Sequence, residues 1–268
     1  MEELNPEKQP AGKIRAAIFD FDGTFSTLRH GWEHVMGPLM LEMISGGKAE
    51  DASEELKKEV AEFIDRSTGI QTVYQMQWLR DRCKECGTGM ADWDEWDYKD
   101  EYNRRLMAEV SRRLSRLENG EDAPDTYLIR GAKEFLHALT DKGVRVYLAS
   151  GTDHDDVVHE ATLLGVAESF TAVRGAPKRM ASCSKEAVIR LILEEEGIAP
   201  EEVMVVGDGK VEIELGAAVG AFTIGAATNE GARQGVDETK RRRLIAAGAD
   251  VIVGDFGDVS ALMTRLGF

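Results

Sequence analysis

Three features are scarce in this chain: cysteine, long apolar runs and positive charge. The 268 residues include three cysteines and have a formal net charge of −16. No run approaches the roughly 20 apolar residues that a membrane-spanning helix needs, and the segment Met1–Pro6 has neither the basic start nor the apolar centre of a signal peptide. Nucleic acid and anionic membranes require a basic surface. We therefore expect a cytoplasmic protein that binds neither nucleic acid nor a membrane.

The cysteines form no complete metal-binding or disulfide pattern. Cys83 and Cys86 have the spacing of half a zinc site, but no second pair or nearby histidine completes four ligands. Cys183 stands alone. Reduced, structural thiols are the favoured interpretation, and zinc binding is the weaker alternative.

The composition is otherwise that of an ordinary globular protein. Hydrophobic residues make up 43% of the chain, and its length allows a substantial core with one inserted domain. The acidic net charge repels anionic substrates, so a cleft that binds one needs local cations to make it attractive.

The most informative segment is Arg15–Thr24, an apolar run that ends in two carboxylates and a glycine turn. Its composition is typical of a buried parallel strand, and Asp20 and Asp22 follow the carboxyl end, where open α/β sheets hold their active sites. Two carboxylates this close repel one another, so a shared cation or a retained proton is needed to stabilise them. Taken alone, the segment also fits an ordinary acidic turn.

Two further strands are predicted to end in polar groups at the same edge of the sheet. The strand at 144–149 is followed by the turn Ser150–Thr152, whose hydroxyls and open backbone amides suit a phosphate oxygen. The strand at 203–206 is followed by Asp208, with Glu212 four residues later. Three strands therefore bring polar or acidic groups to one edge.

Lys185 is predicted to lie at the start of a helix over 185–196. A lysine in that position opposes the helix dipole, which favours a functional reason for it. Lys178 is the alternative, but it follows Pro177 in a loop-like stretch with no helix behind it. We therefore favour Lys185 as the lysine of the site.

These motifs, in this order, resemble those of the haloacid dehalogenase superfamily, whose members are mostly phosphatases. Asp20 matches the family's nucleophile, Asp22 its general acid/base, and Ser150 the phosphate ligand of its second motif. Lys185 matches the lysine of the third motif, and Asp208 matches the metal ligand of the fourth.

The resemblance implies a Mg²⁺ ion held by Asp20, the backbone carbonyl of Asp22 and Asp208. Glu212 stands where the family usually has a second aspartate. Its extra methylene leaves open whether it would contact the ion directly or through water.

Five residues are candidates for contact with the substrate. Thr24, Gly151 and Thr152 lie beside the predicted phosphate-binding groups. Arg29 and His30 follow the first motif, where Arg29 would bind a second anionic group and His30 a sugar hydroxyl or phosphate oxygen. Surface packing at a hinge explains Arg29 and His30 nearly as well.

Strands alternating with helices after Pro124 predict a doubly wound parallel sheet in an α/β fold. We expect a loose N-terminal tail at 1–12 and a core domain formed by 13–27 and 125–268. Residues 28–124 contain several helical segments and no convincing strand, which predicts an inserted α-helical domain. The resembled family carries a cap at this point, which closes over the core and determines substrate specificity.

Two polar segments are better explained as ordinary loops than as parts of a site. The segment 68–75 favours a helix–helix turn with Tyr74 buried. Thr228–Glu230 and Arg233 follow a later strand and favour a surface loop.

We predict a Mg²⁺-dependent phosphatase that acts on a small phosphorylated metabolite, with sugar phosphates as the leading class, through an aspartyl-phosphate on Asp20. A phosphosugar mutase would share Asp20 and Asp22, and a non-catalytic phosphometabolite-binding protein is the alternative from another class. The family's dehalogenases and phosphonate hydrolases lack an acid at the position of Asp22, which argues against both. We expect a monomer or a homodimer.

Overall fold

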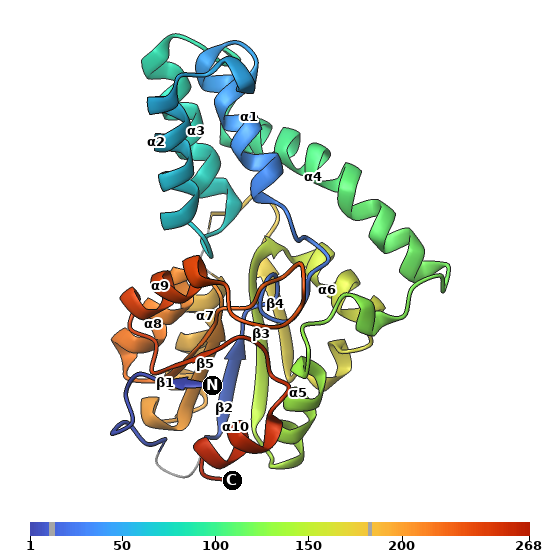
Figure 1. Ribbon diagram of the computed structural model, residues 1–268, viewed down its shortest axis with the longest axis vertical. Helices are drawn as coiled ribbons and strands as arrows, with labels where there is room; N and C mark the ends of the chain where they lie inside the picture. Colours follow the sequence, from blue (N-terminus) through green and yellow to red (C-terminus); the bar gives the residue numbers. More distant parts are fainter. Residues whose placement is uncertain (11–13, 182–183) are drawn as a thin grey trace.

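The computed structural model describes residues 1–10, 14–181 and 184–268, and has a sheet region and a separate group of helices (Figure 1). The sheet has seven strands in the order β1-β7-β6-β5-β2-β3-β4. All neighbouring pairs are parallel except β1 and β7. The strands are β1 (Glu2–Glu3), β2 (Ala16–Phe19), β3 (Arg145–Asp153), β4 (Ala172–Ala176), β5 (Val203–Gly207), β6 (Phe222–Ala226) and β7 (Val251–Val253).

Helices cover both faces of this sheet, which confirms the predicted doubly wound architecture. The flanking helices are α5 (Ala132–Asp141), α6 (His154–Leu163), α7 (Ser184–Arg190), α8 (Lys210–Val219), α9 (Glu238–Ala246) and α10 (Val259–Arg265). Along β2, Ala17 and Phe19 belong to a hydrophobic cluster with α5, α6 and α10, whereas Ala16 and Ile18 pack with α7 and α8 on the other face. None of the described helices has the length and apolarity needed to cross a membrane.

Four of the helices that lie in sequence between β2 and β3 form a group, which Figure 1 shows beyond the end toward which β2 runs. They are α1 (Glu33–Ser45), α2 (Glu54–Arg66), α3 (Thr72–Cys86) and α4 (Glu95–Glu118). Asp94 caps the amino end of α4 by accepting from the amides of Trp96 and Asp97. The helix then buries Tyr102, Leu106 and further residues at helical spacing.

The amino-terminal segment corrects one expectation from the sequence. Residues 1–10 do not form a loose tail, because β1 pairs with β7 and Lys8 forms an ion pair with Asp250 at 2.8 Å. Arg265 also donates to the backbone oxygen of Lys8 at 3.0 Å. A two-residue strand carries too little pattern to be read from sequence, and the predicted boundary at 12/13 lies outside the described residues.

The cysteines predicted to be reduced lie in different surroundings. Cys83 is buried in the helical group and Cys86 is exposed, and both are free thiols. Cys183 lies outside the described residues.

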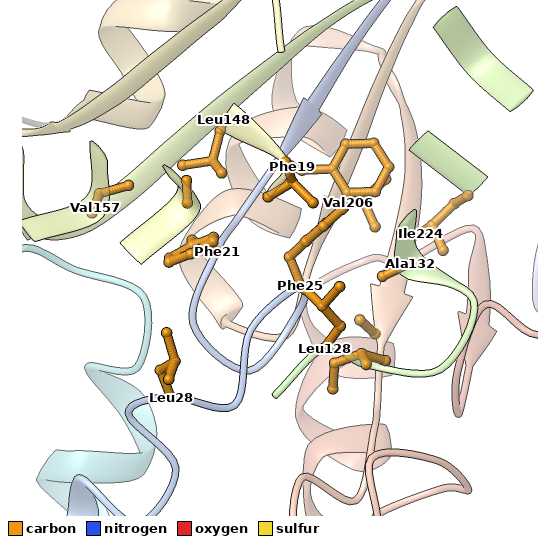
Figure 2. Close-up of a cluster of buried hydrophobic side chains, with 14 of the residues drawn as sticks. Phe19, Phe21, Phe25, Leu28, Leu128, Ala132, Leu148, Val157, Val206 and Ile224 are labelled. Atoms are coloured by element: carbon orange, nitrogen blue, oxygen red, sulfur yellow. The ribbon is translucent and has the colours of Figure 1, made fainter. Parts of the chain in front are cut away.

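A cluster of buried side chains fixes the turn that follows β2 (Figure 2). Phe19, Phe21 and Phe25 are fully buried. The rings of Phe19 and Phe25 meet edge to face, with their centroids 6.0 Å apart. Burial of one such ring contributes about 1.5–3 kcal/mol. The acids at 20 and 22 alternate with these rings, so the packing of the rings holds the acids at the sheet edge.

Candidate active site

Lys185, from α7, lies between two carboxylates at the centre of this edge. Its ammonium is 3.1 Å from Asp20 Oδ1 and 2.8 Å from Glu212 Oε2. Burial opposes the charge of Lys185, but Asp20 and Glu212 outweigh it and raise the pKa of the lysine above its usual range. Lys178 is exposed and does not line the cavity beside Asp20. The lysine stays charged and directs donors toward Asp20.

Glu212 has two partners, one for each carboxylate oxygen. Oε2 accepts from Lys185, and Oε1 accepts from the backbone amide of Gly209 at 2.6 Å. Because Gly209 precedes the first turn of α8, Glu212 also caps that helix. In this arrangement, Glu212 positions Lys185.

Asp208 follows β5 and is held by three contacts. The hydroxyl of Thr24 donates to its Oδ1 at 3.3 Å, and Lys240 donates to its Oδ2 at 2.7 Å. Its backbone oxygen accepts from Arg243 at 3.0 Å. Gly23 allows the first-motif turn to approach this closely, since it has φ of +76° and an added Cβ would lie 2.3 Å from Asp208 Oδ2.

Asp22 faces the end of β3. Its Oδ2 accepts from Thr152 at 2.8 Å and from Ser150 at 3.3 Å. Its Oδ1 is buried and has no hydrogen-bond partner among the described residues. Burial raises the pKa of Asp22, although Arg29 and the bond from Thr152 oppose the change. A carboxyl with these surroundings is suited to hold and release a proton.

The acids of this site fit a divalent cation. Oxygens of Asp20, Asp208 and Glu212 lie within 4.8 Å of one another, and all three residues are buried. Burial and the adjacent charges of Glu212 and Asp208 raise the pKa of Asp20, although Lys185 opposes the change. The cluster therefore carries excess negative charge, and hard carboxylate oxygens are the ligands that Mg²⁺ prefers.

The site opens into a cavity of about 90 Å³ between the sheet edge and the helical group. The loop before α3 reaches this edge of the sheet, because the backbone oxygen of Gly69 accepts from Lys185 at 3.2 Å. Gly69 has φ of +94°, and an added Cβ would lie 2.6 Å from Glu212 Oε2. The described residues on the cavity wall include Asp20, Asp22, Arg29, Gly69, Lys99, Asn103, Ser150, Gly151, Thr152, Asp153, Lys185 and Asp208.

The remaining candidates for substrate contact are placed differently. Arg29 lines the cavity but is bound to Glu160 at 2.6 Å and to Asp156 at 3.0 Å. His30 does not line the cavity, and its Nδ1 lies 3.4 Å from Glu230. Thr24 contacts Asp208 behind the cavity wall.

His30 is expected to titrate above its ordinary pKa of 6.5. The hydrogen bond to Glu230 raises the pKa more than partial burial lowers it. The pair should therefore contribute its full stability below pH 6.5 and lose it as the pH rises through the folded-state value. An NMR titration of the imidazole resonances measures this, and Glu230→Gln should return the pKa toward 6.5. Titration at or below 6.5 in the unmodified protein would contradict the prediction.

The sequence did not reveal some residues at this site. Lys240 is 9% exposed and bridges Asp208 and Glu230, but within the basic run of its helix nothing marks it out. The 68–75 segment is not a simple turn with Tyr74 buried, because Tyr74 is 38% exposed whereas Gly69 lines the cavity. The sequence signal for this contact was Gly69 itself, a glycine in a polar loop between two helices.

Comparison with known proteins agrees with this geometry. The family model of the haloacid dehalogenase-like hydrolases matches residues 14–220. The chain belongs to this family. No curated protein matches the sequence.

Several solved structures share the fold of this haloacid dehalogenase-like hydrolase at low sequence identity. A predicted phosphoglycolate phosphatase from Haemophilus somnus has a TM-score of 0.61 at 19% identity, with 93% of this chain and 97% of that chain covered. A β-phosphoglucomutase from Clostridium difficile has a TM-score of 0.61 at 14% identity, with 94% of this chain and 97% of that chain covered. A phosphonoacetaldehyde hydrolase-like protein from Oleispira antarctica has a TM-score of 0.63 at 15% identity, with 96% of this chain and 94% of that chain covered. These likenesses establish the fold.

Proposed function

We propose that this hydrolase is a Mg²⁺-dependent phosphatase of a small phosphorylated metabolite. The observation that carries the proposal is the position of Asp20, 3.1 Å from the buried Lys185 and beside the carboxylates of Asp208 and Glu212. The cavity of about 90 Å³ is far smaller than pockets for drug-sized ligands, which supports a small substrate. Sugar phosphates are the leading class.

In the proposed reaction, a carboxylate oxygen of Asp20 attacks phosphorus, and the bond from phosphorus to the leaving alcohol breaks. Lys185 and Ser150 stabilise the phosphoryl oxygens, and the proton of Asp22 goes to the leaving oxygen. Asp22 then takes a proton from water, whose oxygen displaces Asp20 and releases phosphate. Asp20, the Asp22 backbone carbonyl and Asp208 would hold Mg²⁺, which neutralises charge on the phosphoryl group. Glu212 would act mainly through Lys185.

We further propose that residues 28–124 act as a cap over the core formed by 13–27 and 125–268. Support comes from the contacts of this segment with the site, since Gly69 binds Lys185 and Arg243 of α9 forms an ion pair with Asp65 at 2.8 Å. A cap in this position excludes water from the phosphoryl site.

A phosphosugar mutase is the second candidate, favoured by the fold shared with the Clostridium difficile phosphoglucomutase and by the presence of Asp22. It would transfer the phosphoryl group from Asp20 to a sugar hydroxyl in place of water. A phosphonate hydrolase is disfavoured despite the Oleispira antarctica neighbour, because Asp22 supplies the acid that those enzymes of the family lack.

The test is phosphate release from a panel of sugar phosphates, phosphoglycolate, nucleotides and phosphoserine, with Asp20→Asn as the blank. We expect one class of ester to be preferred and turnover to fall to background in EDTA and return with Mg²⁺. Product analysis by ³¹P NMR separates phosphate release from transfer to another hydroxyl. Mg²⁺ binding without release or transfer from any ester would reject the proposal in favour of a non-catalytic binding protein.

A further inference from the structure

A second polar group lies on the cavity wall where the helical segment meets the end of β3. Asp153, the last residue of that strand, forms an ion pair with Lys99 through its Oδ1. Its Oδ2 accepts from the amide of Asn103 at 3.2 Å. Lys99 and Asn103 lie four residues apart on one face of α4, and all three residues line the cavity. We call Asp153, Lys99 and Asn103 the polar triad.

Among the residues that the structure describes, the cavity wall has no cation left over for a second anionic group on the substrate. The described wall contains four carboxylates, Asp20, Asp22, Asp153 and Asp208, and three cations, Arg29, Lys99 and Lys185. Each cation already has a carboxylate partner: Arg29 has Glu160, Lys99 has Asp153, and Lys185 has Asp20. A buried charge without a partner is costly. Lys185 and Mg²⁺ would serve the phosphoryl group, and no described residue of the wall offers an unpaired cation to a second anion.

The polar triad is nevertheless well suited to hydroxyl groups. A hydroxyl both donates and accepts, and the triad offers a carboxylate beside an ammonium and an amide. Each oxygen of Asp153 keeps acceptor capacity beyond its bond to Lys99 or Asn103, and each of those donors has further hydrogens. Lys99 is only 4% exposed and lies over the ring of Trp96, so its ammonium is held in place.

We propose that the polar triad recognises the neutral, hydroxyl-bearing leaving group of the substrate and that Asp153 excludes phosphoesters with a second anionic group. The inference rests on the proposed function, and it assigns substrate selection to Asp153, Lys99 and Asn103. A sugar or polyol phosphate fits this wall, whereas a phosphorylated carboxylic acid meets the charge of Asp153.

The sharpest comparison uses two substrates that differ only at the carbon away from phosphate. Glycerol 3-phosphate has a hydroxymethyl group where 3-phosphoglycerate has a carboxylate. We expect the unmodified enzyme to favour glycerol 3-phosphate in kcat/KM by at least about 10-fold. Asp153→Asn keeps the shape of the side chain, removes its charge and leaves Lys99 uncompensated. We expect it to shift the ratio toward 3-phosphoglycerate by about 10- to 100-fold, mainly through KM.

Asp155→Asn is the matched control, because this exposed aspartate makes the same charge change two residues away and does not line the cavity. It should leave the ratio within about twofold. Equal or better turnover of 3-phosphoglycerate by the unmodified enzyme, or an unchanged ratio in Asp153→Asn, would overturn the inference.

A binding measurement separates this inference from the proposed function. Titration calorimetry with Mg²⁺ and Asp20→Asn compares the affinities for the same two esters without needing turnover. We expect tighter binding of glycerol 3-phosphate and a reversal of at least about 10-fold when Asp153→Asn is added. Absence of turnover with this binding pattern would reject the phosphatase and keep the role of the triad. Turnover with equal affinities for the two esters would keep the phosphatase and reject the role of the triad.

Discussion

Replacing Asp20 with asparagine is expected to abolish turnover while leaving the fold intact. The variant loses the anionic oxygen that attacks phosphorus in the proposed reaction, and a neutral amide is a poor nucleophile, so kcat should fall by at least about 10³-fold. Asparagine has nearly the same shape, and its amide oxygen is able to accept from Lys185, which lies 3.1 Å from the native carboxylate. Glu212 still pairs with Lys185 at 2.8 Å in this variant and burial already disfavours the charge of Asp20, so removing that charge should cost little stability.

Two measurements together decide this prediction. Acid-quenched reactions should contain a phosphoenzyme in the unmodified protein and none in Asp20→Asn, and circular dichroism should show the same melting transition within a few degrees. Asp141→Asn, an exposed aspartate at the end of α5, makes the same chemical change away from the site and should retain full activity. Retention of more than a tenth of kcat in Asp20→Asn would remove Asp20 from the role of nucleophile.

The sequence predicts the sheet-edge part of the site because this part follows from local pattern. Asp20 and Asp208 each follow the carboxyl end of a buried strand, Ser150 lies near the carboxyl end of β3, and the registers of β2, β3 and β5 bring these ends side by side. In a parallel sheet, neighbouring strands run in the same direction, so their carboxyl ends lie at the same edge. Once the strands are identified, the positions of their following residues are largely determined.

The other parts of the site depend on tertiary packing and therefore escaped prediction. Lys240 reaches Asp208 only because α9 packs against the sheet with this lysine facing inward, whereas its neighbour Arg242 is exposed. Lys99 and Asn103 belong to a charge-rich helix, which by pattern alone is a solvated surface. Only the tertiary position of that helix beside the end of β3 brings them to Asp153. Helix–sheet docking of this kind has no signature at the level of residue spacing.

Replacing Lys185 with methionine is expected to impair both catalysis and stability. Loss of a preorganised donor at the phosphoryl group should lower kcat by about 10²–10³-fold. The substitution also leaves the buried carboxylates of Asp20 and Glu212 without the ammonium that lies 3.1 Å and 2.8 Å from them. Removal of one partner from a buried ion pair costs about 3–5 kcal/mol in the free energy of unfolding.

The loss of stability in Lys185→Met should depend on pH in a predictable direction. Without Lys185, which lowers it, the pKa of Asp20 should rise further, because this buried carboxylate then faces the like charges of Glu212 and Asp208. A carboxyl with a raised folded-state pKa destabilises the fold above that pKa and regains stability as the pH falls. The deficit in Lys185→Met should therefore shrink as the pH falls from 8 toward 5, and Mg²⁺ should restore part of it at pH 8.

Urea unfolding in EDTA, at both ends of that pH range, measures the deficit directly, and the same measurement at pH 8 with Mg²⁺ in place of EDTA measures what the cation restores. Lys210→Met is the matched control, because this lysine begins α8 and pairs at 3.3 Å with Glu214 on the surface, where ion pairs contribute about 0–1 kcal/mol. An equal loss in both variants would show that Lys185 is an ordinary structural lysine. A loss confined to Lys185→Met and relieved by protons or Mg²⁺ identifies the same excess of negative charge that the proposed cation would neutralise.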